Sequence, residues 1–62
     1  METYDFEWKV VNSTTARKAV IREIRDGFEV ELVERSEDGD SFEYLVFEEL
    51  LAARLEVILW LS

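Results

Sequence analysis

The chain has 62 residues, of which 48% are hydrophobic, and its formal net charge is −8 at pH 7. It contains no cysteine and no histidine, which excludes disulfides, thiolate ligands, histidine metal sites and histidine general bases. The negative charge opposes direct contact with nucleic acids and anionic membranes. The hydrophobic content is too high for a disordered acidic tail, so we expect one small folded domain over residues 1–62.

A cytoplasmic location is the expectation from the apolar segments of the sequence. Met1 to Asp5 lack the basic start and the apolar run of a signal peptide. The long apolar stretch Val57 to Leu61 is too short to cross a bilayer.

The first predicted element is a strand from Tyr4 to Val11, where apolar and polar side chains alternate. Period-two alternation that is rich in aromatic residues is typical of a half-buried strand. The side chains predicted to point one way are Tyr4, Phe6, Trp8 and Val10, with Asp5, Glu7 and Lys9 on the other side. The polar run Asn12 to Thr15 then predicts a turn.

The segment Ala16 to Arg25 allows two interpretations. As a helix over residues 14–25, it would have a hydroxyl cap at its start and Gly27 after its end, giving a β-α-β-β-α order. As a strand, it would join the next strand through a three-residue bulged loop, Arg25 to Gly27. That register places Ile24 opposite Phe28, Arg22 opposite Val30 and Val20 opposite Leu32. We favour the strand.

Two further strands are predicted in the middle of the chain. Phe28 to Glu34 alternates as a strand, and Ser36 to Ser41 consists of residues that favour loops. Phe42 to Phe47 is predicted as a strand because Leu45 to Phe47 is bulky and follows a turn. An alternative is a single helix that begins near Asp40 and continues to the end of the chain.

From Glu48 onwards the residues are strong helix formers. Leu51, Leu55 and Ile58 share one helix face, which we expect to pack inward, with Leu50, Val57 and Leu61 at its edges. A C-terminal strand over Leu55 to Leu61 is the alternative. The sequence therefore predicts an α+β fold, in which an antiparallel sheet of three or four strands carries one C-terminal helix on its apolar face.

Catalysis and metal binding find little support in the sequence. Glu29 and Glu31 alternate with core residues and are expected to face water, whereas carboxylate catalysis needs burial. Asp38 and Asp40 have part of the spacing of a calcium loop, but Gly39 lies at the wrong position for one. We therefore expect that the protein is not an enzyme and that it has no cofactor and no metal site.

The distribution of charge suggests a second, more specific interpretation. Ten acidic residues and one basic residue lie between Asp26 and Glu49. Either the charges on neighbouring elements complement each other, or the acidic residues form one continuous surface that resembles a phosphate backbone to a basic partner. At the C-terminus, a helix on one sheet buries only one of its sides, so Leu59 and Trp60 would project elsewhere. Either part of this segment caps the open end of the sheet, or it forms an exposed apolar patch with Trp60 as its anchor, which marks an interface.

We expect a non-catalytic protein-binding module that regulates or inhibits a larger partner. In the narrower version it mimics nucleic-acid charge and blocks a basic nucleic-acid-binding protein, as an anti-defence inhibitor of phage type would. The alternative is a homodimer or an accessory subunit that assembles through the apolar C-terminal helix. The predicted contact residues are Glu29, Glu31, Glu34, Glu37, Asp38, Asp40, Leu59 and Trp60.

Overall fold

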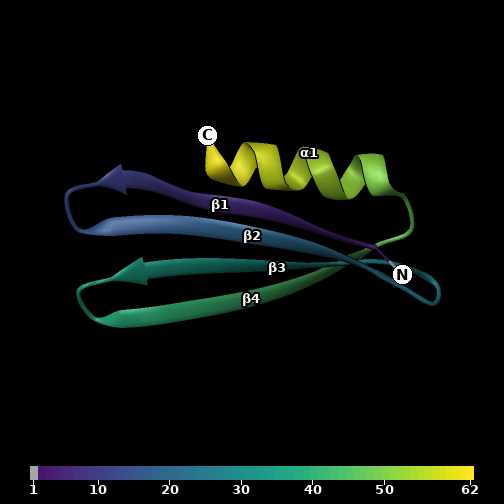
Figure 1. Ribbon diagram of the computed structural model, residues 1–62, viewed down its shortest axis with the longest axis horizontal. Coiled ribbons are helices and arrows are strands. Elements are labelled where there is room, and N and C mark those ends of the chain that lie inside the picture. Colours follow the sequence, from purple (N-terminus) through teal and green to yellow (C-terminus); the bar gives the residue numbers. More distant parts are fainter. Residues whose placement is uncertain (1) are drawn as a thin grey trace.

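A computed structural model describes residues 2–62 as four strands followed by one helix. The elements are β1 (Thr3–Asn12), β2 (Thr15–Ile24), β3 (Gly27–Ser36), β4 (Gly39–Phe47) and α1 (Leu50–Leu61). The strands form one antiparallel sheet in the order β1-β2-β3-β4, and α1 turns back along the sheet from the end of β4 (Figure 1). The predicted α+β fold is confirmed. Residues 15–24 form a strand, so the helical alternative for this segment is wrong.

Each pair of neighbouring strands is joined by a two-residue loop. The loops are residues 13–14, 25–26 and 37–38. In the first loop the Asn12 side-chain oxygen accepts hydrogen bonds from the Thr14 backbone N–H at 2.9 Å and from the Thr14 hydroxyl at 3.0 Å. In the third, the Asp38 N–H donates to the Ser36 hydroxyl, so β4 begins at Gly39 and the loop is shorter than expected.

The β2–β3 hairpin is one residue out of the expected register. Ile24 pairs with Gly27, not with Phe28, across the loop Arg25-Asp26. A one-residue slip turns every side chain of a strand to the opposite face of the sheet. The expected pairs Arg22–Val30 and Val20–Leu32 are therefore replaced by Arg22–Glu29 and Val20–Glu31.

The observed register satisfies both burial and charge. Ile21 lies opposite Val30, and both side chains are fully buried. Arg22 moves to the face of the sheet away from α1, which we call the open face, where Glu29 and Glu31 pair with it. In the expected register Arg22 would have faced Val30 without an acidic partner.

Strand β1 departs from simple alternation. Its pairing with β2 shifts between Phe6 and Lys9 and again between Val10 and Asn12. Tyr4 and Phe6 pack against the core beneath α1 as predicted. Trp8 instead lies on the open face beside Lys18, because an extra residue in an edge strand reverses the facing of the residues beyond it. The prediction that Trp8 and Val10 share a face with Phe6 is wrong.

The core lies between α1 and the helix-covered face of the sheet. Its buried cluster comprises Ala19, Ile21, Val30, Leu32, Ala53 and Val57. Leu50, Trp60 and Leu61 pack against this cluster from the same side of the helix. Within residues 2–62, no helix has the length and apolar character needed to span a membrane.

The inward side of α1 differs from the predicted one. Leu51, Leu55 and Ile58 were expected to pack inward, but all three are exposed, while Ala53 and Val57 are fully buried. Apolar residues lie on both the inward and the outward side of the helix, with Arg54 and Glu56 between them, so its sequence pattern does not select a face. The small side chain of Ala53 suits the side on which the helix backbone comes closest to the sheet.

Candidate protein-binding surface

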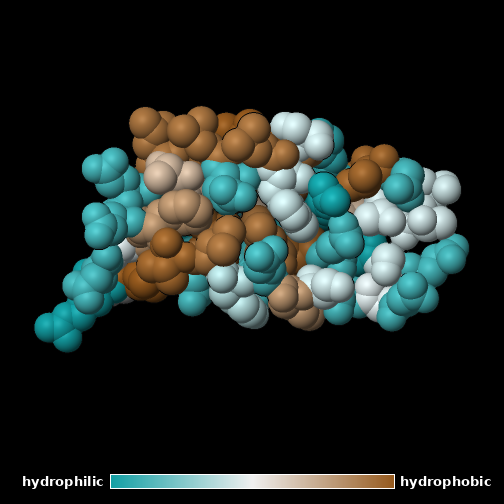
Figure 2. All heavy atoms as spheres, turned by 180° about the vertical axis from the view of Figure 1, so that it is seen from behind, coloured by the Kyte–Doolittle hydropathy of each residue, from teal (hydrophilic) through white to brown (hydrophobic). Residues whose placement is uncertain are grey.

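The side of α1 that points away from the sheet is apolar and exposed. Its four large aliphatic side chains have between 53% and 72% of their surface accessible. We call this surface the outer face; it comprises Leu51, Ala52, Leu55, Ile58 and Leu59. Figure 2 shows it as part of a continuous hydrophobic band along the helix. Exposed contiguous apolar surface of this kind is a candidate interaction site.

Helix geometry arranges the outer face around one central residue. At 3.6 residues per turn, Leu51 and Ile58 lie on one flank of Leu55, and Ala52 and Leu59 lie on the other. The charged neighbours Arg54 and Glu56 lie beyond these flanks. The outer face itself therefore carries no charge.

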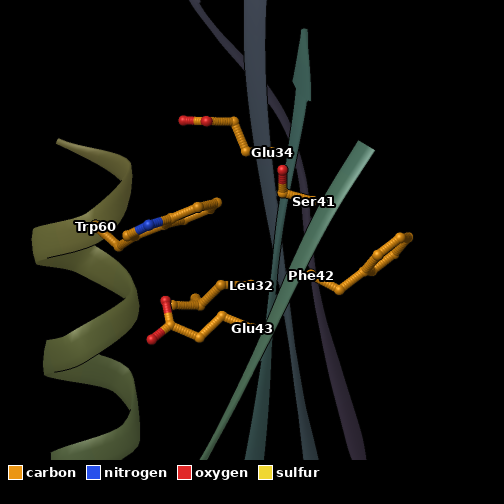
Figure 3. Close-up of a pocket in the computed structure, with 6 residues that line it drawn as sticks. All are labelled: Leu32, Glu34, Ser41, Phe42, Glu43 and Trp60. Carbon is orange, nitrogen blue, oxygen red and sulfur yellow. The ribbon is translucent and has the colours of Figure 1, made fainter. Parts of the chain in front are cut away.

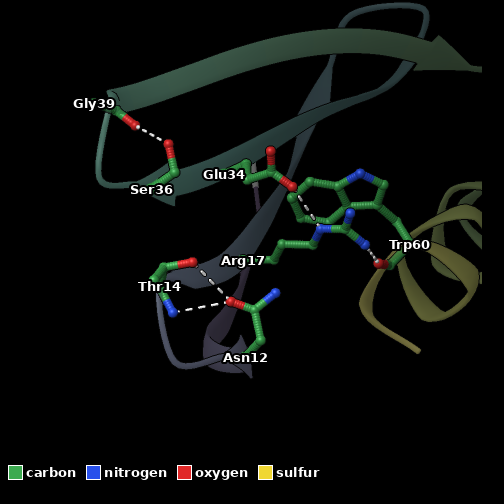
Figure 4. Close-up of polar contacts among 7 residues, drawn as sticks. All are labelled: Asn12, Thr14, Arg17, Glu34, Ser36, Gly39 and Trp60. Atoms are coloured by element: carbon green, nitrogen blue, oxygen red, sulfur yellow. Dashed lines mark hydrogen bonds and ion pairs between the residues drawn. The ribbon is translucent and has the colours of Figure 1, made fainter.

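Trp60, in contrast, belongs to the inward side and is held there by Arg17. The Arg17 guanidinium donates to the Trp60 backbone carbonyl and to the Glu34 carboxylate, each at 3.0 Å, and lies 5.0 Å from the centre of the indole ring (Figure 4). Of the two alternatives for this segment, the exposed patch anchored by Trp60 does not form, because Trp60 packs against the core. Leu59, the neighbouring predicted contact residue, is exposed on the outer face.

The open face carries a network of ion pairs. Arg22 Nη2 donates to Glu31 Oε1 at 2.9 Å, and Arg22 Nη1 lies 3.6 Å from Glu29 Oε1. The Tyr44 hydroxyl donates to the second Glu31 oxygen at 2.9 Å. These hydrogen bonds lower the pKa of Glu31, and the bond from Arg22 has the larger effect of the two.

Arg35 forms a second set of contacts on the open face. Its guanidinium donates to both Asp40 oxygens, at 3.0 and 3.2 Å, and this lowers the pKa of Asp40. The same guanidinium lies 4.4 Å from the centre of the Trp8 ring, and the Lys18 ammonium lies 5.9 Å from it. Trp8 is thus fixed by two cations.

The remaining predicted acidic contacts lie elsewhere. Glu34 is on the helix-covered face with Arg17, whereas Glu37 and Asp38 form the exposed loop between β3 and β4. The six acidic residues are thus divided among two faces and a loop. Within residues 2–62, no group of three or more histidine, cysteine or carboxylate side chains could hold a metal ion.

A groove separates the C-terminal part of α1 from β3 and β4. It has a volume of about 350 Å³ and is lined by Leu32, Glu34, Ser41, Phe42, Glu43 and Trp60. Trp60 reaches toward the sheet, and Glu43 points toward the helix, while Phe42 points to the opposite side of β4 (Figure 3). The sequence did not indicate Glu43 as a site residue, because the side of the sheet on which its side chain lies depends on the β3–β4 register.

Comparison with known proteins adds no functional information. No protein-family model matches the chain, and no curated protein or solved structure matches it either.

Proposed function

We propose that this protein is a non-catalytic binding module that assembles with a second copy of itself through the outer face of α1. The observation that carries the proposal is the exposure of Leu51, Leu55, Ile58 and Leu59 in one uncharged stripe. Full burial of one such side chain contributes about 1.5–3 kcal/mol, so each would gain on the order of 1 kcal/mol when a partner covers it.

A second copy fits this face because the face is uncharged. Each chain carries a net charge of −8, which repels other copies at long range. An outer face free of charge lets two copies meet without burying like charges. A domain of this size also gains much from a partner, because its own core contains only a few fully buried side chains.

The outer face is also self-complementary about Leu55. In a dimer with two-fold symmetry, residues of one copy meet the same patch on the other. Antiparallel helices centred on Leu55 would place Leu51 of one copy against Ile58 of the other, and Leu59 against Ala52. The large Leu59 thus faces a small residue, which favours close packing.

This assembly leaves the sheet free to contact a larger partner. The acidic composition supports the proposal that this partner is basic and that the module regulates or inhibits it. Nucleic-acid mimicry is the narrower proposal, and it would have to use carboxylates such as Glu37 and Asp38 at the exposed loop. Glu31 and Asp40 are engaged by arginines instead.

Molar mass measured by light scattering after size exclusion tests the proposal. We expect the unmodified chain to be a dimer that persists at high salt, because salt screens the repulsion between copies without weakening apolar contacts. Leu55→Glu should give a monomer. Val10→Glu is the matched control, since Val10 is 74% exposed but lies outside the outer face, and it should remain dimeric. A monomeric unmodified chain at every concentration and salt would overturn the proposal.

A further inference from the structure

The two edges of the sheet differ in a way that points to function. β1 forms one edge, and its pairing is interrupted by two register shifts. β4 forms the other edge and pairs with β3 in unbroken register from Gly39 to Phe47. Sheets usually protect their edges with bulges, lysines or prolines, because unpaired backbone groups invite another strand. β1 carries bulges and Lys9, whereas β4 has no bulge and no lysine, and its one charge on the helix-covered face is Glu43.

The outer edge of β4 has backbone N–H and C=O groups that could pair with a further strand. Hydrogen-bonded and non-hydrogen-bonded pairs alternate along an antiparallel ladder, and the two-residue loop makes Ser36–Gly39 a hydrogen-bonded pair. By this alternation Phe42, Tyr44 and Val46 direct their N–H and C=O groups away from β3. Within residues 2–62 no strand pairs with β4 on this side, and the side chains of these three residues are all exposed.

The groove beside Trp60 determines which strand fits. Side chains of an added strand alternate between the two faces of the sheet. Those on the helix-covered face would lie beside Glu43, at the mouth of the groove whose other walls are Trp60 and Glu34. Glu34 is paired with Arg17, but Glu43 forms no ion pair within the described residues 2–62. An aromatic ring and a free carboxylate together suit the stem and the charge of a lysine or arginine.

We infer that β4 binds an extended segment of a basic partner protein as a fifth strand. Its helix-side residues are basic and enter the groove beside Glu43 and Trp60, and its alternate residues are apolar and lie beside Phe42, Tyr44 and Val46 on the open face. Addition of a strand to a sheet edge is an established mode of peptide recognition. A second copy of β4 fits less well, because it would bring Ser41, Glu43 and Leu45 to this side instead of a cation. The inference does not depend on pairing through α1.

A peptide of alternating lysine and valine, blocked at both ends, is the probe for this site. We expect it to bind and to slow hydrogen exchange of the Phe42, Tyr44 and Val46 amides, measured by NMR on the full chain. A peptide with the same residues but contiguous lysines, and one of alternating glutamate and valine, should not bind. Failure of the first peptide to bind, binding of either control with similar affinity, or protection of β1 amides instead would overturn the inference.

Two variants of the chain separate backbone pairing from charge. Tyr44→Pro removes an outward N–H without removing a β3–β4 hydrogen bond, and should abolish binding, whereas Tyr44→Ala keeps the N–H, loses one apolar contact with the peptide, and should weaken binding only partly. Glu43→Gln, which leaves the fold intact, should weaken binding about fivefold at low salt. Unchanged affinity of Glu43→Gln would refute the proposal that the groove recognises a basic side chain. Protection of the β4 amides without peptide, increasing with protein concentration, would show that a second copy occupies the edge.

Discussion

The Arg17 guanidinium donates a 3.0 Å hydrogen bond to the backbone carbonyl of Trp60, and this bond joins β2 to the last turn of α1. The last carbonyls of a helix have no partner within the helix and carry partial negative charge. A cation is therefore well placed here, particularly because α1 has no basic residue in its own last turn. The same side chain pairs with Glu34, so one residue fixes the inward side of α1 and, with it, the orientation of the outer face.

Arg17→Met should destabilise the domain by about 1–2 kcal/mol, because it keeps an apolar stem but removes the donors to Trp60 and Glu34. Urea unfolding measures the change in free energy. Arg25→Met removes an exposed guanidinium that forms no ion pair within residues 2–62 and serves as the control; it should change stability by less than about 0.5 kcal/mol. Equal effects of the two substitutions would show that Arg17 does not fix the helix.

Val57→Ala should destabilise the domain by about 2 kcal/mol, because Val57 is fully buried under α1. Leu51→Ala should have little effect on a single chain, since the Leu51 side chain is largely exposed. Both are best measured by urea unfolding in the Leu55→Glu background, where self-association does not contribute. A larger effect for Leu51→Ala would mean that the inward side of α1 has been assigned wrongly.

Gly27→Ala and Gly39→Ala form a matched pair at equivalent loop ends. Both glycines have positive φ, 152° for Gly27 and 116° for Gly39, which L side chains rarely adopt. A Cβ at Gly27 would collide with the Phe47 backbone carbonyl, whereas one at Gly39 would meet open space. We expect Gly39→Ala to cost about 1 kcal/mol and Gly27→Ala at least about twice as much in urea unfolding. Equal costs would contradict the close approach of β4 to Gly27.

Acid should weaken the domain partly through Glu31. Its pKa is lowered in the folded chain, first by the hydrogen bond from Arg22, so its contribution to stability is complete above the unfolded pKa of about 4.3. That contribution is lost as the pH falls through the lower, folded pKa. Glu31→Gln should therefore be less stable than the unmodified chain at neutral pH, and the difference should shrink in acid. Melting temperatures recorded across this range test this, and Tyr44→Phe should show a smaller effect of the same sign.

Structural features that depend on one short segment could be predicted from the sequence. The alternation of apolar and polar residues predicted strand β1, and it predicted that Tyr4 and Phe6 lie in the core, because period-two burial is a local property of the sequence. The change of face at Trp8 was not predictable, since the bulge arises from pairing with β2. The helix was predicted from Glu48 onwards, two residues before its observed start at Leu50, but it could not be oriented, because apolar residues lie on both its inward and its outward side.

The candidate surfaces depend on contacts between distant segments. Arg17 and Trp60 are 43 positions apart, and nothing local to either residue indicates their contact. Likewise, the groove at Glu43 exists only because the β3–β4 register turns that carboxylate toward α1. The β2–β3 register differed from expectation by one residue, which was enough to move Arg22 into contact with Glu29 and Glu31.

The central claim, that two copies pair antiparallel through the outer face, is tested most directly by cysteine cross-linking, since the chain has no cysteine of its own. Leu55→Cys should form a disulfide-linked dimer under mild oxidation, because the two Leu55 positions meet at the two-fold axis. Leu51→Cys alone should stay uncross-linked, but should link to Ile58→Cys when the two variants are mixed. Absence of the Leu55→Cys cross-link, or equally rapid cross-linking of Val10→Cys outside the outer face, would contradict this account.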